Sequence, residues 1–481
     1  MGCSFVSQTE KHMKSLNLTG KDLRRMDYPE SPAIAAAIEY AAKYTNADRE
    51  MVLQKLKDIL DNPAAFTEDE EVMAIANPLI EREKEVISLT EAKGYSIYGS
   101  DNIEQGARDQ METAMKLPVA VAGALMPDAH QGYGLPIGGV LATHNTIIPY
   151  GVGVDIGCRM CLSIFDIPET HFKDNIMQYK RDLIACTKFG AGHGFHGQYK
   201  ADHEVLDSSA FNINSFIRNL KDKAYSQLGT SGGGNHFVEW GVIEMHEDDK
   251  ALNIPKGRYL ALLSHSGSRG LGATIAGQYT RIAKELCKLP KEAANLAYLD
   301  LNSEAGSEYW QLMNLAGDYA SACHNVIHDK LALTVGGKML ARVENHHNFA
   351  WKEMYEGKEV IVHRKGATPA AKGVMGIIPG SMTAPGFLVR GRGDESSLNS
   401  AAHGAGRQMS RTLASKTFDR SMMKSILREH DVMLIGGGTD EAPGAYKDIR
   451  QVMSAQQSLV DIVATFQPKM VRMADDGSRE D

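Results

Sequence analysis

Acidic, thiol and imidazole side chains that can bind a metal ion lie in glycine-rich loops in the middle of the chain. The candidates are Asp155, Cys158, His236, His265 and one member of the pair His346 and His347. Adjacent imidazoles point in different directions on a helix or a strand, so only one of the pair is expected to reach a shared ion, and the spacing does not choose between them. This mixed oxygen, sulfur and nitrogen set suits a borderline divalent ion such as Mn²⁺ or Zn²⁺ and is too soft for a dedicated Mg²⁺ site. The wide sequence intervals exclude a zinc-finger module.

A histidine in the segment NSAAHGAGR, residues 399–407, has the surroundings of a nucleophile. An imidazole nitrogen can attack phosphorus and form a phosphoramidate. The small residues around His403 would admit a bulky phosphoryl donor, and Arg407 can hold its oxygens. The structural alternative is a tight turn that enters a helix over about 407–416.

Two further loops offer polar groups to a ligand. The three glycines before Asn235 let backbone approach a ligand closely, while Asn235 and Glu239 can hydrogen-bond a phosphate or a sugar hydroxyl. Arg269 follows a predicted strand and can bind phosphate. Each of these loops also has a purely structural interpretation, in which Asp155 caps a turn, Cys158 is a small buried side chain and the histidines cap local backbone.

Several common nucleotide and hydrolase motifs are missing from the sequence. There is no G-x-x-x-x-G-K-[ST] loop, no G-x-G-x-x-G that closes a strand with an acidic partner, and no G-x-S-x-G elbow. A nucleotide, if this chain binds one, is therefore held in another way.

The elements that must position these loops change character along the chain. Residues 1–115 repeat apolar side chains at helical spacing, which predicts helices over residues 32–44 and 49–62. From about Leu125, short apolar runs end in Gly, His and Asn loops, and a long helix is predicted over residues 307–332. Strand-loop units mixed with helices, without regular βαβ alternation, predict an α+β fold with mixed or antiparallel sheets.

Composition limits the class of protein further. The 481 residues carry 52 basic and 60 acidic side chains, a net charge of −8, so nucleic acid would have to meet a local cationic groove, which we expect around Arg269, Arg364, Lys365 and Arg407. The six cysteines do not follow the regular spacing of a disulfide-rich protein, so we expect them to be reduced thiols. No run is apolar for long enough to span a membrane, so a cytoplasmic protein without a membrane partner is expected.

Taken together, the segments resemble the RtcB family of GTP-dependent RNA ligases. The similarity runs from about Leu125 to Asp448 and follows the family's order through PDAHQGYGLPIGGV, DIGC, GNHFVE, HSGSRGLG, HHN, HRKGAT, PGSM, HGAGR and APGAYKD. So many motifs in one order are highly specific, whereas any one alone is weak.

The resemblance implies a role for each matching residue. Two Mn²⁺ ions would be held by Asp155, Cys158, His236, His265 and His347, with the Cys158 sulfur bridging them, and His403 would become guanylylated. Arg269 and Arg407 would bind phosphate or RNA. The implied nucleotide site comprises Asn235, His236, Phe237, Val238, Glu239, His347, Asn348, Pro379, Gly380, Ser381, Met382, Gly386, His403, Gly404, Ala405 and Gly406.

The implied activity joins an RNA 3′-phosphate, or a 2′,3′-cyclic phosphate after its opening, to a 5′-hydroxyl through a His–GMP intermediate. Its partners would be GTP and RNA with broken ends, such as transfer RNA or ribosomal RNA, in RNA repair or tRNA splicing. Two alternatives use the same residues: a dinuclear-metal phosphoesterase or cyclic phosphodiesterase, and an inactive relative that associates with RNA or ribosomes. The oligomeric state cannot be read from the sequence.

The chain departs from the family pattern at three places. Gly386 lacks the hydroxyl usual at that position, and the C-terminal lysine that contacts guanine in the family has no match, although Lys469 and Arg472 lie nearby in sequence. The first 95 or so residues do not match the family's usual start. We therefore expect a helical N-terminal extension over residues 1–95, one large catalytic domain over 96–473 and a frayed tail over 474–481.

Overall fold

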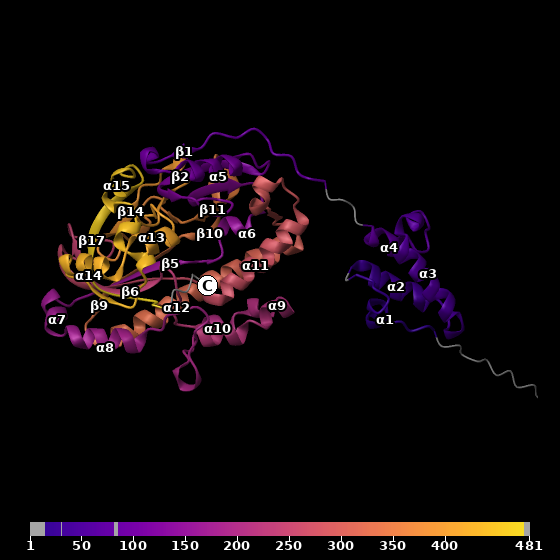
Figure 1. Ribbon diagram of the computed structural model, residues 1–481, viewed down its shortest axis with the longest axis horizontal. Helices are drawn as coiled ribbons and strands as arrows, with labels where there is room; N and C mark the ends of the chain where they lie inside the picture. Colours follow the sequence, from indigo (N-terminus) through magenta and orange to yellow (C-terminus); the bar gives the residue numbers. More distant parts are fainter. Residues whose placement is uncertain (1–14, 30, 81–84, 476–481) are drawn as a thin grey trace, which may run out of the picture. The chain divides into compact units, whose positions relative to one another are not determined.

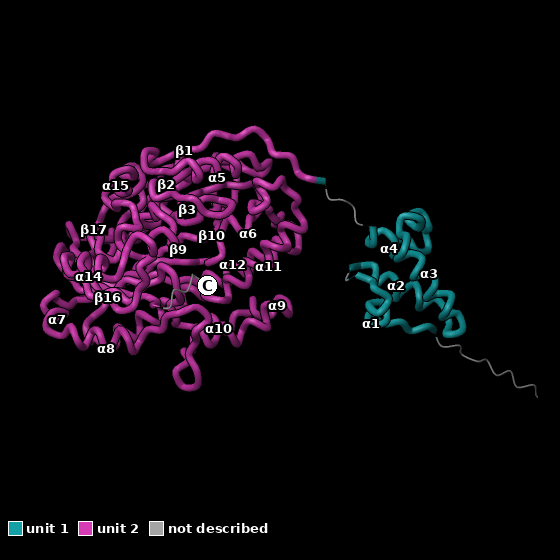
Figure 2. The backbone as a smooth tube through the Cα atoms, viewed as in Figure 1, with its two compact units in different colours: residues 1–85 teal, residues 86–481 magenta. Residues whose placement is uncertain are grey.

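The computed structural model describes residues 15–29, 31–80 and 85–475. It divides into two compact units, Met1–Glu85 and Val86–Asp481 (Figure 2). Residues 86–95, assigned above to the extension, belong to the larger unit: the Ile87 N–H donates to the Lys288 carbonyl at 2.8 Å, and Leu89 and Tyr95 pack on one of its cores. No helix among the described residues is long and apolar enough to cross a membrane.

The smaller unit is helical and has its own core. Its helices are α1 (Gly20–Arg24), α2 (Pro32–Ala42), α3 (Arg49–Asp61) and α4 (Met73–Ala76). The predictions over residues 32–44 and 49–62 are confirmed by α2 and α3. The Ser31 side chain accepts from the Ala33 N–H and starts α2, and α3 buries Val52, Leu56 and Ile59 on one face, as the helical spacing requires.

The larger sheet of the second unit has eight strands and is antiparallel except where β16 joins it (Figure 1). In spatial order the strands are β13 (Met375–Ile378), β14 (Gly386–Gly391), β17 (Val460–Met473), β6 (Phe237–Met245), β7 (Gly257–Ser266), β5 (Arg159–Phe165) and β9 (Met339–His346), with β16 (Met433–Ile435) parallel to β17. All seven residues of β5 are buried, which explains its almost continuous apolar run.

A second sheet and two short strand pairs complete the β structure. The five-stranded sheet has the order β1 (Ser96–Ile97), β2 (Ala120–His130), β3 (Ile137–Thr143), β11 (Lys358–Lys365) and β10 (Asn348–Tyr355). The short pairs are β12 (Ala367–Pro369) with β15 (Ser400–Ala402), and β4 (Thr146–Ile147) with β8 (Leu299–Asp300). Antiparallel sheets combined with separate helices confirm the predicted α+β class.

Helices connect and cover the sheets of this unit. They are α5 (Gln105–Met115), α6 (Pro149–Val152), α7 (Glu169–Asp174), α8 (Ile176–Cys186), α9 (Ser215–Arg218), α10 (Lys221–Gln227), α11 (Arg269–Leu286), α12 (Glu304–Val335), α13 (Arg411–Thr417), α14 (Arg420–Glu429) and α15 (Ile449–Ser454). The helix predicted over residues 307–332 is confirmed by α12, which the Ser303 side chain starts by accepting from the Gly306 N–H.

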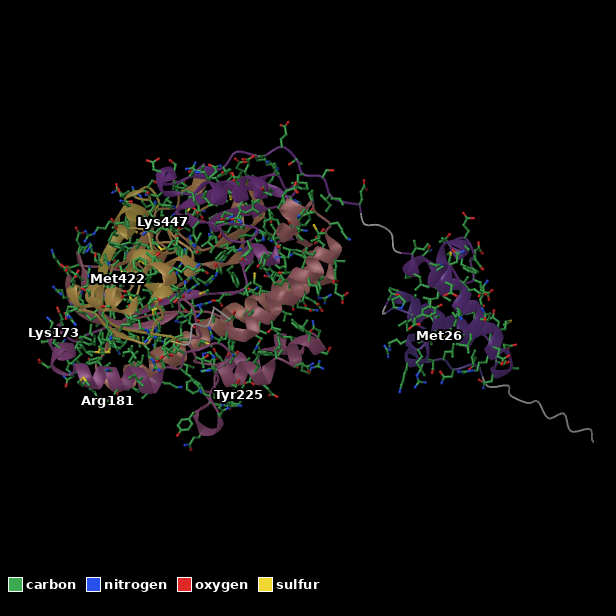
Figure 3. All side chains as sticks on the ribbon, viewed as in Figure 1. Met26, Lys173, Arg181, Tyr225, Met422 and Lys447 are labelled. Atoms are coloured by element: carbon green, nitrogen blue, oxygen red, sulfur yellow. The ribbon has the colours of Figure 1, made fainter. Side chains whose placement is uncertain are left out.

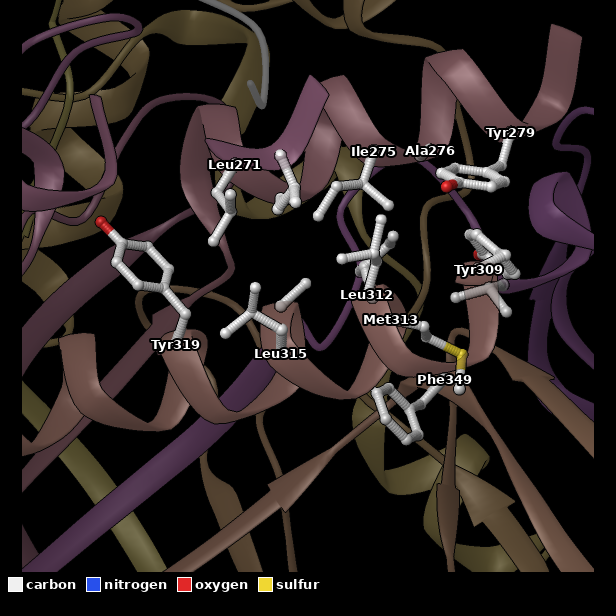
Figure 4. Close-up of a cluster of buried hydrophobic side chains, with 14 of the residues drawn as sticks. Leu271, Ile275, Ala276, Tyr279, Tyr309, Leu312, Met313, Leu315, Tyr319 and Phe349 are labelled. Carbon is white, nitrogen blue, oxygen red and sulfur yellow. The ribbon is translucent and has the colours of Figure 1, made fainter. Parts of the chain in front are cut away.

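The largest core of this unit forms where α11 and α12 pack on each other (Figure 4). Leu271 and Ile275 from α11 meet Leu312 and Leu315 from α12, and the rings of Tyr279 and Tyr309 lie 5.4 Å apart. Burying a leucine or isoleucine side chain contributes about 1.5–3 kcal/mol, so this contact holds both helices firmly. Because α12 also packs on β5 and β7, the core fixes the strands that carry the candidate site.

Candidate active site

Strand register brings the predicted metal ligands to one edge of the larger sheet. Cys158 directly precedes β5, His265 lies next to the end of β7, and His347 directly follows β9. Within the sheet, Arg159 pairs with both Ser266 and His346, and Phe237 pairs with His265. His236 precedes Phe237, so four segments remote in sequence end side by side.

The potential ligand atoms form two overlapping groups that share one sulfur. Cys158 Sγ lies 3.1 Å from His265 Nε2, which in turn lies 3.2 Å from His347 Nε2. On the other side, Cys158 Sγ lies 3.5 Å from His236 Nε2, and that nitrogen lies 3.0 Å from Asp155 Oδ2. Each group of three could hold one ion, and all five side chains are buried.

Hydrogen bonds to carbonyl groups determine which ring nitrogen His236 and His265 turn to the cluster. His236 Nδ1 donates to the Ser231 carbonyl at 2.7 Å, and His265 Nδ1 donates to the Asn235 carbonyl at 3.3 Å. Since a carbonyl only accepts, the Nε2 atom of each of these rings in its neutral form carries the lone pair, and it faces the Cys158 sulfur. Burial lowers the pKa of His265 and of His347 well below the ordinary value, which keeps both rings neutral. A cluster of unprotonated donors at these separations fits divalent cations.

The neighbouring imidazole takes a different position. His346 stacks on Trp351 with ring centroids 4.9 Å apart, while the ring of His347 lies 4.9 Å from that of His403. Of the pair that the sequence left open, His347 is therefore the member that reaches the cluster.

The predicted nucleophile His403 is held by a carboxylate that sequence reasoning did not select. His403 Nδ1 lies 2.6 Å from Oδ2 of Asp128, which also accepts from the His403 backbone N–H at 3.2 Å. Asp128 is fully buried on β2, within the PDAH motif. Its carboxylate fixes the ring with the proton on Nδ1 and leaves the Nε2 lone pair available. Gly406 makes this approach possible, because it adopts a φ of +71° and a Cβ there would lie 2.1 Å from the Asp128 carbonyl oxygen.

The two features open into one cavity of about 460 Å³, a size typical of small-ligand sites. Predicted residues that line it are Asp155, Cys158, Asn235, Phe237, Glu239, His265, His347, Asn348, Pro379, Gly380, Ser381, Met382, Gly386, His403, Gly404, Ala405, Gly406 and Arg407. Asn235 Oδ1 is buried without a hydrogen-bond partner, as expected of a ligand-binding group.

Alternation along β6 separates the predicted contacts into two faces. Asn235, Phe237 and Glu239 line the cavity, whereas Val238 packs in a core with Trp240 on the opposite face. Burial raises the pKa of Glu239 well above the ordinary carboxyl value, so this side chain is protonated and can both donate and accept a hydrogen bond.

Several predicted cations lie outside the cavity. Arg269 is fully buried, with its guanidinium 3.2 Å from His236 Nδ1. Arg364 is also fully buried, and it binds Glu353 through two hydrogen bonds. Lys469 forms an ion pair with Asp431, and Arg472 donates to carbonyl groups around Thr187. The cationic groove expected around Arg269 and Arg364 is therefore not formed by those two residues.

The cavity contains polar residues to which sequence reasoning gave no role in the site, apart from Lys365, which it placed in the expected cationic groove. Lys365, in HRKGAT, donates to the Tyr133 and Tyr150 carbonyls at 2.5 and 3.2 Å, and burial lowers its pKa to about 7. Arg411 and the APGAYKD residue Tyr446 both contact Glu441, whose pKa burial raises. His130 completes this set. The motifs were the available signal, but no residue type in them separated cavity side chains from core ones.

Comparison with known proteins agrees with this arrangement. The family model described as tRNA-splicing ligase RtcB matches residues 110–211 and 203–474. The chain belongs to the RtcB family. It is 33% identical over 399 residues to the RNA-splicing ligase RtcB1 of Escherichia coli, covering 76% of this chain and 93% of that protein. It is 30% identical over 451 residues to the tRNA-splicing ligase RtcB of Nanoarchaeum equitans, covering 78% and 94%.

The match places the site of this RtcB-family chain within the family's shared region. Every predicted cavity residue, from Asp155 to Arg407, lies inside the matched ranges, whereas the smaller unit, up to Glu85, lies outside them. The family resemblance inferred from the motifs is thereby confirmed.

Proposed function

We propose that this protein is a GTP- and Mn²⁺-dependent RNA ligase that joins a 3′-phosphate or 2′,3′-cyclic phosphate end to a 5′-hydroxyl end. One observation carries the proposal: the imidazole of His403, oriented by Asp128, faces the same cavity as the Cys158-centred ligand cluster. The names of the relatives, RNA-splicing and tRNA-splicing ligases, support the class of reaction.

The residues fit two manganese ions. Asp155, Cys158 and His236 would hold one, and Cys158, His265 and His347 the other, so that the thiolate is shared. Imidazole, carboxylate and thiolate ligands together suit Mn²⁺ or Zn²⁺ better than Mg²⁺. When bound, such ions offset the negative charge of phosphates and orient them.

The protein side chains then serve the nucleotide-transfer step. Asp128 keeps the proton on His403 Nδ1, so that Nε2 attacks the α-phosphorus of GTP; a phosphorus–nitrogen bond forms and pyrophosphate leaves. Arg407 and Lys365 lie in the cavity where they can bind phosphate oxygens. Asn235 and the protonated Glu239 offer hydrogen bonds to the nucleotide.

Two transfers complete the proposed reaction. The RNA 3′-phosphate oxygen attacks the phosphorus of the His403 adduct, which frees the imidazole and leaves GMP joined to the RNA end. The 5′-hydroxyl then attacks the RNA 3′-phosphorus, GMP leaves, and a phosphodiester results. A 2′,3′-cyclic phosphate must first be opened by water. Broken transfer RNA and broken ribosomal RNA both present such ends, and the free thiols, including Cys161 and Cys323, are in keeping with a cytoplasmic location.

Labelling with GTP tests the proposal directly. The full chain is incubated with Mn²⁺ and GTP labelled at the α-phosphorus, then separated under denaturing conditions. We expect an acid-labile label that His403→Ala removes, and joining of an RNA 3′-phosphate to a 5′-hydroxyl RNA. Release of phosphate from the RNA, with no label from any nucleotide, would favour the phosphoesterase alternative and contradict the ligase.

A further inference from the structure

Basic side chains are concentrated in the segment that begins at the catalytic cavity and continues through α13 and α14. Residues 407–428 contain six basic side chains, Arg407, Arg411, Lys416, Arg420, Lys424 and Arg428, and only one acidic side chain, Asp419. Asp419 is committed to the start of α14, where its carboxylate accepts from the Ser421 and Met422 N–H groups. In a chain of net charge −8, this segment is a local concentration of positive charge.

The first two cations belong to the cavity, and the others face solvent. Arg407 and Arg411 line the cavity and bind Glu441. Arg420, Lys424 and Arg428 are exposed, and no ion pair or side-chain hydrogen bond within the described ranges engages them. They follow one another at intervals of four residues, so they form one row on α14 with steps of about 6 Å along the helix axis.

This row borders a groove of about 720 Å³ that α14 shares with α7, where Figure 3 labels Met422 and Lys173 at the same end of the molecule. Lys173 and Lys469 stand on the other elements of the groove. The two acidic side chains lining it are already neutralised, because Glu169 pairs with Lys173 and Arg258, and Asp431 pairs with Lys469.

A packed apolar layer lies between the groove and the catalytic cavity. Met423 and Leu427 of α14 line the groove and pack against Met382, Val471 and Met473, which line the cavity. The α13–α14 segment therefore begins at the cavity and forms one wall of the groove. The cavity arginines Arg407 and Arg411 and the cations of α14 thus belong to one short stretch of chain.

We propose that the α14 row, Arg420, Lys424 and Arg428, binds the sugar-phosphate backbone of the RNA strand beyond the end being joined. The inference rests on the proposed ligase function. An extended row of unpaired cations suits a polymer with regularly repeated charges, and such contacts add affinity without reading sequence. The row would act on RNA binding alone and take no part in forming the His403 adduct.

The test replaces the row and measures two steps separately. In the variant Arg420→Gln, Lys424→Gln, Arg428→Gln, we expect labelling of His403 by GTP to be unchanged. Binding of a 20-nucleotide RNA 3′-phosphate should weaken about 10- to 50-fold at 0.15 M salt, and the slope of log affinity against log salt should fall by about 2. A dinucleotide 3′-phosphate, which ends within the cavity, should keep its KM.

A control variant that loses the same number of positive charges elsewhere distinguishes RNA binding at the α14 row from a general effect of net charge. Lys288, Lys291 and Lys358 are exposed, lie away from the groove lining and can be changed to Gln together. This control should retain the affinity and the salt slope of the parent. Equal losses in both triple variants, or no loss in the α14 variant, would overturn the inference. Absence of any His403 label in the parent chain would instead count against the proposed function.

Discussion

Two clusters of cysteine and histidine lie on opposite faces of strands β5 and β7, and they differ in what surrounds their ligand atoms. On one face, His265 Nε2 lies 3.1 Å from the Cys158 sulfur and 3.2 Å from His347 Nε2, and no hydroxyl of the described residues lies between them. On the other face, the potential ligand atoms of Cys161, His324 and His328 lie within 4.8 Å of one another, as do those of the first cluster. Both clusters are buried, so proximity and burial do not distinguish them.

In the Cys161 cluster, hydrogen bonds with serine hydroxyls and a backbone carbonyl satisfy the ring nitrogens of both histidines. His324 Nε2 donates to the Ser266 carbonyl at 3.1 Å, so its Nδ1 accepts from the Ser264 hydroxyl at 2.6 Å. That hydroxyl then accepts from His328 Nε2 at 2.7 Å. His328 Nδ1 in turn accepts from Ser163, at 2.8 Å. Every ring nitrogen has a partner of the right kind, and each histidine is held as one tautomer.

The difference shows how one pair of strands builds a reactive face and an inert face. Adjacent residues 264 and 265 of β7 point to opposite sides. On the cavity side, no hydroxyl group of the described residues contacts the Nε2 atoms of His236, His265 and His347. Their neighbours are the Cys158 sulfur, the Asp155 carboxylate and one another, so these atoms can bind a cation. On the α12 side, serine hydroxyls hydrogen-bond the ring nitrogens instead and make a polar core. We therefore expect metal binding at the Cys158 cluster and none at the Cys161 cluster.

The largest effect should come from exchanging one cysteine in each cluster. Cys158→Ala removes the shared ligand, so we expect loss of both ions and a fall in RNA joining of more than about 10³-fold. Cys161→Ala removes an equally buried thiol but no ligand, and should keep two Mn²⁺ per chain and most activity. Metal content and ligation rate are measured on both. Loss of metal in Cys161→Ala would contradict the comparison.

A large effect is also expected when the partner of His403 is changed. In Asp128→Asn the amide can donate to His403 Nδ1, which would move the ring proton to Nε2 and remove the nucleophilic lone pair. The rate of His403 labelling by GTP should fall by about 10²–10⁴-fold, as expected for the wrong tautomer. Metal content should not change, because Asp128 contacts no ligand of the Cys158 cluster; loss of metal would show that the carboxylate acts on the cluster instead.

A moderate effect on stability is expected at the serine between the two histidines. Ser264→Ala leaves His324 Nδ1 and His328 Nε2 without partners in the core. Each buried unsatisfied group costs about 1–3 kcal/mol, so the two together should lower the free energy of unfolding by about 2–6 kcal/mol. Denaturant unfolding measures this loss. The control is Ser425→Ala, at an exposed serine, which should change the free energy of unfolding by less than about 0.5 kcal/mol. Ser400 is also fully buried, but it is not a suitable control because Arg364 donates a hydrogen bond to it.

Sequence reasoning selected residues that the structure brings together where the chemistry requires a particular residue type, and it gave no guide where only the fold decides which way a side chain points. Cys158, His265 and His403 were selected because few side chains bind metal or attack phosphorus. Asp128 was missed because one carboxylate in a motif looks like any other until β2 places it beside residue 403. Arg269 was expected at a phosphate, yet it begins α11 with a φ of +57° and is buried behind His236. The choice between residues 346 and 347 likewise needed the position of Trp351.

The smallest expected effect is the pH dependence of stability that the inert cluster contributes. Burial lowers the pKa of His324 to about 4, below the ordinary value near 6.5 in the unfolded chain. Between these values the unfolded chain binds a proton that the folded chain does not, so stability is retained above pH 6.5 and lost as the pH falls toward 4. From pH 7 to pH 5 the loss from this residue should be about 2 kcal/mol.

The variant His324→Asn isolates this contribution, because an amide can both donate to the Ser266 carbonyl and accept from Ser264 but does not titrate in this range. Unfolding by denaturant at pH 7 and pH 5 should show that the parent loses about 2 kcal/mol more than the variant. Burial also lowers the pKa of His363 to about 4. Such histidines change the stability of parent and variant by the same amount between pH 7 and pH 5, so their effect cancels when the two proteins are compared. Equal losses in the two proteins would mean that His324 is protonated in the folded state at pH 5, and the serine chain would then no longer support the expectation that this cluster binds no metal.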